Sequence, residues 1–232
     1  MINKKVAVLS DIHANLQALQ SVLADCVQQG VEEYWLLGDY VTYGANPIEC
    51  VKLLSELNVK YAIGGNHDVH HFSDVVPLTY TGSYEATEFT NRIILENRDK
   101  FQWLEKVAVV DKIDIPEIKT TLVHGSLRQP YLGRITPGVN ESELFMGMEL
   151  RDIDTLLIGH LHWSYMLTEK GRTIINCGSV GQPRNKIPMA QYVILEDYNV
   201  SYRRAKYDIA KAADAIRQAG LPDELWEILY TG

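Results

Sequence analysis

The first 63 residues alternate between short apolar runs and helix-like segments, and this alternation constrains the fold more than any other feature. Residues 5–10 are rich in Val, Ala and Leu with little polar alternation, which is typical of a strand buried on both faces. Apolar residues then recur at helical spacing from Leu16 to Cys26, and Gly30 closes that segment before a second apolar run at 34–37. The pattern predicts a βαβ unit at the start of the chain.

The same unit repeats, and the second half of the chain is richer in strands. Pro47 stands at the first position of a predicted helix over 47–57, which precedes a strand at 60–63. Residues 84–106 are helical in pattern, as are 209–219 and 222–229, whereas predicted strands cover 107–115, 120–124, 156–158, 165–168, 173–176 and 191–196. We therefore expect one domain over residues 1–232 of the α/β class, a four-layer α/β/β/α sandwich of two mixed sheets flanked by helices.

Composition and charge exclude several classes of protein. Of the 232 residues, 46% are hydrophobic and 22% charged, so the chain can bury a core. The 22 basic and 30 acidic residues give a formal charge of −8 without a basic cluster, which disfavours nucleic-acid binding. No apolar run reaches the roughly 18 residues of a membrane span, and the run near the amino terminus is too short for a signal peptide. We expect a cytoplasmic protein with reduced thiols at its three cysteines.

Metal-binding side chains follow the predicted strands, at the edge where parallel sheets present functional groups. They are Asp11 and His13 after the first strand, Asp39 after the second, Asn66 after the third, and later His124, His160 and His162. Each short motif is weak alone, because Asp-x-His arises by chance and a Gly-Asp pair is an ordinary turn. Their recurrence at five strand ends favours a shared site, since burying so many ionisable groups without a metal or partner would be costly.

The ordered set resembles the calcineurin-like metallophosphoesterase superfamily. The matching blocks are Asp11-x-His13, Gly38-Asp39-x-x-x-x-Gly44, Gly65-Asn66-His67-Asp68, His124 and Gly159-His160-x-His162, within residues 6–183. A further block resembles the family's Asn-Pro-Gly-Ser, but Cys177 stands in Asn176-Cys177-Gly178-Ser179 where proline is common. This departure affects the rigidity of a loop and leaves the ligand set intact.

The resemblance implies a site for two metals. Asp11, His13 and His162 would hold one metal, Asn66, His124 and His160 the other, and Asp39 would bridge both. The mixture of carboxylate, amide and imidazole ligands suits two divalent transition-metal ions, with Mn or Fe favoured and Zn allowed. A hydroxide bridging the metals would then attack phosphorus.

The resemblance also nominates residues beside the metals. His67 matches the family's catalytic histidine, which stabilises the transition state or protonates the leaving oxygen. Asp68 either orients a catalytic imidazole or is a local turn carboxylate. Asn15 either contacts substrate phosphate or caps the first helix, and Arg184 either anchors phosphate or forms a surface salt bridge.

Other residues near the motifs have plainer interpretations. Tyr40 and Tyr43 either line the pocket and stack on a base or contribute to packing, which we favour. His70 and His71 match no ligand position, so we expect exposed or structural roles for both.

Several functions are compatible with this ligand set. The first is hydrolysis of a small phosphodiester or a nucleotide polyphosphate. A protein Ser/Thr phosphatase or a phosphomonoesterase is the alternative, although the former is typically longer. A nuclease is disfavoured by the absence of basic stripes, and a non-catalytic metal-binding scaffold is disfavoured by the presence of His67. The sequence does not define the oligomeric state, and we expect residues 70–106 and 127–145 to set specificity.

Overall fold

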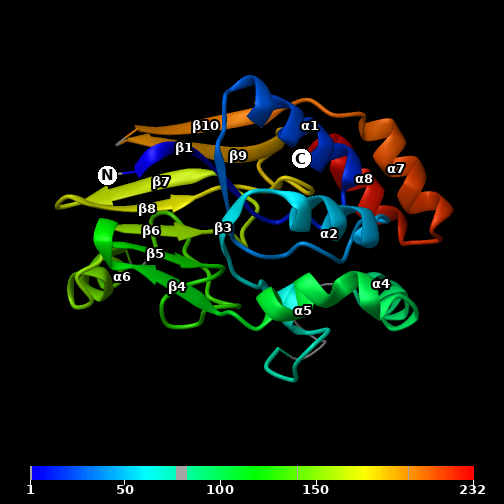
Figure 1. The fold of residues 1–232 in the computed structure, drawn as a ribbon, viewed down its shortest axis with the longest axis horizontal. Coiled ribbons are helices and arrows are strands. Elements are labelled where there is room, and N and C mark those ends of the chain that lie inside the picture. The colour runs from blue at the N-terminus through cyan, green and yellow to red at the C-terminus, as the bar shows by residue number, and fades with distance from the viewer. Residues whose placement is uncertain (1, 77–82, 140, 198) are drawn as a thin grey trace.

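Two five-stranded sheets form the centre of the molecule (Figure 1). The computed structural model describes residues 2–76, 83–139, 141–197 and 199–232. Within these residues, no helix is both long enough and apolar enough to cross a bilayer.

Sheet A carries the βαβ opening that the sequence predicts. Its order is β10-β9-β1-β2-β3, with β1 parallel to β2, β2 parallel to β3, and antiparallel pairing of β9 with β1 and β10. The strands are β1 (Ile2–Leu9), β2 (Glu33–Leu36), β3 (Val59–Ala62), β9 (Ala190–Asp197) and β10 (Asn199–Ala205). Alternate side chains of β1 enter different cores, as in a strand covered on both faces.

Sheet B is also mixed, in the order β4-β5-β6-β8-β7. Strands β5, β6 and β8 run parallel, and β4 and β7 pair antiparallel at the edges. The strands are β4 (Lys112–Ile115), β5 (Thr120–Val123), β6 (Thr155–Ile158), β7 (Tyr165–Glu169) and β8 (Arg172–Asn176). The predicted strand at 107–115 is wrong in its first part, because Val107 and Ala108 continue a helix that packs on sheet A.

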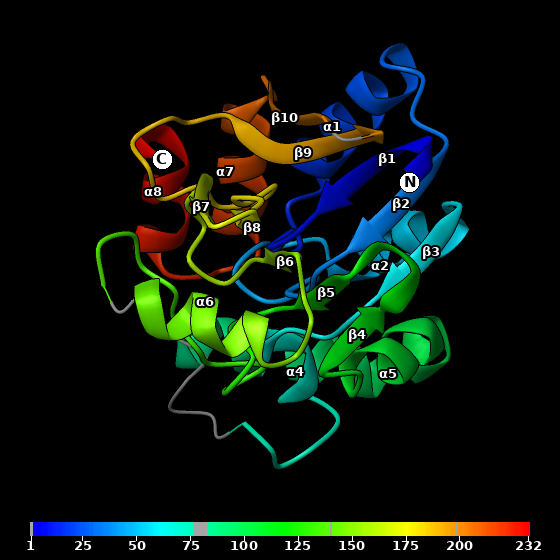
Figure 2. The ribbon, with the colours of Figure 1, turned by 90° about the vertical axis from the view of Figure 1, so that its left-hand side faces the viewer.

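Helices cover the outer faces of both sheets (Figure 2). They are α1 (Leu16–Gln28), α2 (Pro47–Glu56), α3 (Asn66–Val69), α4 (Tyr84–Glu96), α5 (Gln102–Ala108), α6 (Glu141–Glu149), α7 (Ile209–Gln218) and α8 (Asp223–Thr231), with 3₁₀ helices η2 (Arg98–Phe101) and η3 (Pro116–Ile118). Figure 1 places α4, α7 and α8 at the opposite end of the molecule from α6.

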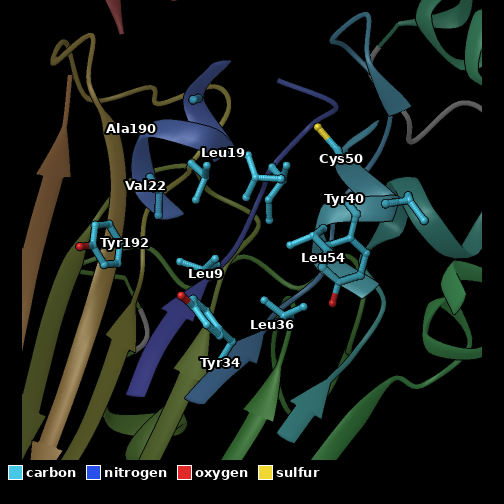
Figure 3. Close-up of a cluster of buried hydrophobic side chains, with 14 of the residues drawn as sticks. Leu9, Leu19, Val22, Tyr34, Leu36, Tyr40, Cys50, Leu54, Ala190 and Tyr192 are labelled. Atoms are coloured by element: carbon cyan, nitrogen blue, oxygen red, sulfur yellow. The ribbon is translucent and has the colours of Figure 1, made fainter. Parts of the chain in front are cut away.

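Three apolar cores hold the layers together. Leu19, Val22 and Leu54 pack α1 and α2 against the outer face of sheet A (Figure 3). A second core lies between the sheets, with Val8 and Leu37 on the sheet A side facing residues such as Leu122 on the other. A third joins sheet B to α6. The predicted α/β/β/α sandwich is confirmed.

Candidate metal centre

The polar residues that follow β1, β2, β3, β5 and β6 gather at one rim of the sandwich. Backbone hydrogen bonds tie the loops to one another. Asp11 N–H donates to the Gly38 carbonyl (2.9 Å), and His13 N–H donates to the Asp39 carbonyl (3.0 Å). Gly159 N–H donates to the carbonyl of His124, directly after β5 (2.9 Å). The strand ends therefore place motifs that are up to about 150 residues apart in contact, as parallel sheets do.

One group of ligand atoms comes from Asp11, His13, Asp39 and His162, all buried and within 4.8 Å of one another. Asp11 Oδ1 lies 3.1 Å from His162 Nε2 and 3.8 Å from His13 Nε2. This oxygen is buried but makes no hydrogen bond with any described residue. A buried carboxylate oxygen left in this way is an expected sign of a missing cation.

A second group comes from Asp39, His124 and His160, again within 4.8 Å. Asp39 Oδ2 lies 3.2 Å from His124 Nε2 and 3.7 Å from His13 Nε2, so it stands between the groups. Asn66 Oδ1 is 2.9 Å from His160 Nδ1, which brings the predicted amide ligand to the same place. All seven predicted ligands therefore meet, with Asp39 shared.

Backbone carbonyls orient three of the imidazoles. Nδ1 of His13 donates to the Val41 carbonyl (3.2 Å), that of His124 to the Leu37 carbonyl (2.7 Å), and that of His162 to the Gln182 carbonyl (2.5 Å). Because a carbonyl can only accept, each neutral ring carries its lone pair on Nε2.

The Nε2 atoms of His13 and His162 lie only 3.0 Å apart. In neutral rings two lone pairs would face each other there, and a shared cation removes that repulsion. The residues present therefore fit a metal.

The backbone at the site is strained. Asp11, His13, Asp39, His160 and His162 all have φ between 47° and 68°, a left-handed conformation that costs a residue other than glycine about 1 kcal/mol or more. Such strain persists where the surrounding structure imposes it, and it concentrates at functional sites.

Two glycines allow the loops to approach one another. A side chain at Gly65 would overlap the Asp39 carboxylate, and one at Gly159 would overlap the hydroxyl of Ser10. Close approach therefore requires glycine at both positions.

A model of the calcineurin-like phosphoesterase superfamily domain matches residues 5–199. The chain belongs to the calcineurin-like phosphoesterase superfamily. This membership and the buried Asp/His cluster place it among metal-dependent phosphoester hydrolases.

Relatives of this phosphoesterase share its whole length. The uncharacterized protein MJ0912 of Methanocaldococcus jannaschii is 32% identical, with full coverage of both chains. The structure of a metallophosphoesterase from Sphaerobacter thermophilus is 30% identical, covers 99% of each chain and has a TM-score of 0.83. A hypothetical protein, PH1004, from Pyrococcus horikoshii shares the fold at 22% identity, with 98% coverage of each chain and a TM-score of 0.81.

Electrostatics in the phosphoesterase site follow from burial and from the two buried carboxylates, Asp11 and Asp39. Burial opposes ionisation of Asp39, but the surrounding imidazoles, His124 foremost, hold its pKa well below the usual range. Burial alone would lower the pKa of His124, whereas the Asp39 charge raises it to about 9. For His13, burial dominates and its pKa falls well below the usual value. The centre therefore keeps its carboxylates ionised and ready for a cation.

His67 and Asp68 belong to the phosphoesterase motif after β3, but their side chains make different contacts. The His67 ring packs against His13, with ring centroids 5.0 Å apart, and its backbone N–H donates to Asp39 Oδ1 (2.9 Å). Asp68 instead accepts from the backbone N–H groups of Asp39 (2.6 Å), Tyr40 (2.8 Å) and Gly65 (2.9 Å). Burial and the nearby Asp39 charge raise the pKa of Asp68 to about 7. Its carboxylate thus joins the loops after β2 and β3.

Asn15 and Arg184 lie beside the phosphoesterase ligands. Asn15 caps α1 by accepting from Ala18 N–H (3.1 Å), and its amide donates to the Gly181 carbonyl (2.8 Å). Arg184 is exposed, and its Nη2 donates to Gln182 Oε1 (2.6 Å). The Arg184 N–H donates to the carbonyl of the ligand His162 (3.0 Å), which places it at the edge of the site.

Sequence reasoning missed the supporting role of Gln182. Its carbonyl orients His162 while its side chain holds Arg184. The only sequence signal was its position three residues after the Asn176-Cys177-Gly178-Ser179 block. The residues that orient an imidazole through a backbone carbonyl leave no mark on sequence, because any side chain supplies the same group.

Proposed function

We propose that the protein is a dinuclear metal-dependent phosphodiesterase that acts on a small phosphodiester or a nucleotide polyphosphate. The observation that carries this proposal is the pair of buried ligand groups that share Asp39. In it, Asp11, His13, Asp39 and His162 hold one metal, and Asp39 with Asn66, His124 and His160 holds the other. Mixed oxygen and nitrogen ligands favour Mn or Fe, with Zn also compatible.

When bound, two such cations supply a water of near-neutral pKa and neutralise charge on the phosphoryl oxygens. Asp39 sets the spacing of the two ligand groups, since one oxygen of its carboxylate faces an imidazole from each. In their neutral forms, His13, His124 and His162 offer fixed lone pairs on Nε2 because their Nδ1 atoms donate to carbonyls. The protein thus provides a preorganised centre for an in-line displacement at phosphorus.

His67 is proposed to hydrogen-bond the leaving oxygen. Burial lowers its pKa to about 4, so the ring is neutral near pH 7 and retains one N–H donor. The ring lies beside His13 and within the loop of the ligand Asn66. A donor fixed at this place stabilises the negative charge that develops as the ester bond breaks.

Arg184 is proposed to bind phosphate at the rim. Gln182 orients its guanidinium through two contacts, from Nε (3.2 Å) and from Nη2 (2.6 Å), at the exposed edge of the site. Asn15 is proposed to act through structure instead, because its side chain caps α1 and holds the Gly181 loop. Asp68 is likewise proposed to position Asp39 and not to touch substrate.

A substrate panel tests the proposal. Protein loaded with Mn²⁺ is assayed with bis(p-nitrophenyl) phosphate, p-nitrophenyl phosphate, a dinucleoside tetraphosphate and a phosphopeptide. We expect the diester or the dinucleotide to show the highest kcat/KM. Preference for the phosphopeptide would replace the proposal with a protein phosphatase, and preference for the monoester with a phosphomonoesterase.

Matched variants separate catalysis from folding. His67→Gln is expected to lower kcat by about 10²- to 10⁴-fold, the range for a positioned donor. His70→Gln is the control, because that half-buried ring bonds to the Val76 carbonyl (2.8 Å) and not to the ligand groups. Turnover by metal-stripped protein at the full rate, or none by any metal form, would reject the mechanism.

A further inference from the structure

The ring of His67 differs from those of the neighbouring histidines in the hydrogen bonding of its Nδ1. Its Nδ1 is buried and makes no hydrogen bond to any residue that the structure describes. In contrast, His13, His124 and His162 each donate from Nδ1 to a backbone carbonyl. The rings of His13 and Tyr43 pack against this ring instead.

Tyr43 supplies the closest of these ring contacts. Its ring centroid lies 4.6 Å from that of His67 and also 4.6 Å from that of His13, so it touches both. The Arg184 guanidinium lies over the same ring, 5.7 Å from its centroid. Tyr43 is only 8% exposed, which leaves its ring little freedom to turn.

The backbone of Tyr43 is strained, with a φ of 68°, and Thr42 before it has a φ of 70°. A left-handed conformation at a bulky residue is unfavourable unless surrounding contacts impose it. The position of the Tyr43 ring is thus set by packing from outside the loop.

The C-terminal helices provide that packing. Tyr43 belongs to a buried apolar cluster whose other members come from α4, α7 and α8 and from the turn between the last two, namely Ala86, Ala212, Ile216, Leu221, Leu225 and Leu229. Leu225 and Leu229 of α8 also line a small void together with His13 and Tyr43. Helices α7 and α8 lie beyond residues 5–199, the part of the chain that matches the superfamily domain.

We propose that Tyr43 is a positioning residue that holds the His67 ring towards the leaving oxygen, and that α8 acts on the reaction by holding Tyr43. The proposal rests on the proposed function, in which His67 hydrogen-bonds that oxygen. Tyr43 itself contacts no reacting atom. Its ring, and not its hydroxyl, carries the effect on His67.

Substitution of Tyr43 tests the role of the ring. Tyr43→Leu keeps apolar volume but removes the flat ring, and it is expected to lower kcat for the diester by about tenfold or more, within the range that a misplaced donor forfeits. Tyr43→Phe keeps the ring and is expected to recover most of that kcat, with a rise in KM because the hydrogen bond between the Tyr43 hydroxyl and Arg184 is lost. An equal loss of kcat in both variants would overturn the role of the ring.

A double-mutant cycle shows whether Tyr43 acts through His67. Tyr43→Leu is combined with His67→Gln, and kcat is measured for a diester with an alkyl leaving group. If Tyr43 works only by placing His67, adding Tyr43→Leu to His67→Gln changes kcat by less than about twofold. Additive losses would show a general structural effect and would overturn the proposal.

The leaving group provides a second readout. A p-nitrophenolate leaves with little assistance, whereas an alkoxide needs a hydrogen-bond donor. Tyr43→Leu is therefore expected to slow the alkyl diester more than the p-nitrophenyl diester. Equal slowing of both substrates would contradict an action through His67.

The contribution of α8 is tested with Leu229→Ala. Leu195→Ala is the matched control, because Leu195 is similarly buried, at 5% against 3% exposed, but lies on β9 in the core between the sheets. We expect the two variants to lose similar stability. Only Leu229→Ala is expected to lower kcat, by about threefold or more and with the same dependence on leaving group as Tyr43→Leu. Equal kinetics for the two variants would remove α8 from the proposal.

These outcomes remain distinct from failure of the proposed function. If His67→Gln itself left kcat unchanged, the role of His67 would fall, and the inference about Tyr43 would fall with it. If His67→Gln lowers kcat while Tyr43→Leu does not, only the positioning role is rejected.

Discussion

At the residue scale, the metal centre depends on one carboxylate. One oxygen of Asp39 accepts from His67 N–H (2.9 Å), and the other faces His13 and His124 at 3.7 and 3.2 Å. Asp39 also adopts a φ of 56°, so its backbone is in the strained left-handed conformation. A single side chain thus links both candidate ligand groups and the loop of His67, the proposed catalytic histidine.

Asp39→Asn is expected to reduce the metal content and to lower kcat/KM by about a hundredfold or more. Asparagine tolerates the left-handed backbone, so the loop keeps its shape while the bridging charge is lost. Even groups that only support ligands are worth about 10- to 100-fold. Metal content is measured by mass spectrometry of the digested protein, with Asp114→Asn, an exposed change on β4, as the control. Two metals retained per chain would contradict the bridging role.

At the element scale, hydrogen bonds through His71 join the loop after β2 to α4. Thr42 Oγ1 lies 3.2 Å from His71 Nε2, and His71 Nδ1 lies 2.6 Å from Asn91 Oδ1. Asn91 accepts through its amide oxygen, so Nδ1 carries the proton and Nε2 accepts from the Thr42 hydroxyl. These hydrogen bonds restrain the loop after β2, and they give His71 the structural role that its lack of a motif predicts.

His71→Gln is expected to flatten the dependence of stability on pH. Burial lowers the pKa of His71 to about 4 from its ordinary 6.5. As the pH falls, the His71 ring therefore takes up a proton in the unfolded chain before it does so in the folded protein. Its contribution to the free energy of unfolding is fully present above pH 6.5 and is lost as the pH drops towards 4. Urea unfolding at pH 7 and pH 5 should show a loss about 2 kcal/mol larger in the wild type than in the variant. Equal losses would contradict the buried neutral state.

Element prediction succeeded where a local pattern decides the structure. The helix over Leu16–Gln28 carries its apolar residues at helical spacing and begins at the cap residue Asn15, both visible in sequence. Among the α-helices and strands, α3, α6 and β10 had no predicted counterpart. Strand β10 lies at the edge of sheet A and buries few side chains, so its sequence Asn-Val-Ser-Tyr-Arg-Arg-Ala is mostly polar. Pairing with β9, and not its own periodicity, makes it a strand.

At the scale of the whole molecule, the predicted metal ligands come from loops on both sheets. Asp11, Asp39 and Asn66 follow strands of sheet A, whereas His124 and His160 follow strands of sheet B. Metal bound at this site would therefore connect the two halves of the sandwich and favour the folded state over the unfolded chain.

Mn²⁺ is expected to raise the melting temperature of metal-stripped protein by about 5–10 °C at a hundredfold excess over its Kd. Linkage gives about 2.7 kcal/mol at that excess, and a chain of this size gains about 2–4 °C per kcal/mol. Thermal unfolding monitored by circular dichroism measures the shift. Mg²⁺ should give a smaller shift, because imidazoles suit it poorly. An equal shift with Mg²⁺, or none with Mn²⁺, would contradict the proposed ligand set.

Sequence alone determined the class of fold and which residues meet at the centre. Apolar runs and their spacing report local burial, and metal-binding residues are restricted to a few types, so both leave readable patterns. The single-domain organisation, the cytoplasmic location and the substrate stay predictions.

Only the tertiary structure decided what surrounds the centre. The carbonyls of Val41, Leu37 and Gln182 orient imidazoles without any side-chain signature, and the C-terminal helices reach Tyr43 from about 180 residues away in the chain. The role of residues 70–106 and 127–145 in specificity stays a prediction, and the packing of α7 and α8 with Tyr43 had no sequence signal. Such contacts arise from packing between distant elements, and an apolar residue has the same appearance in sequence whichever core it enters.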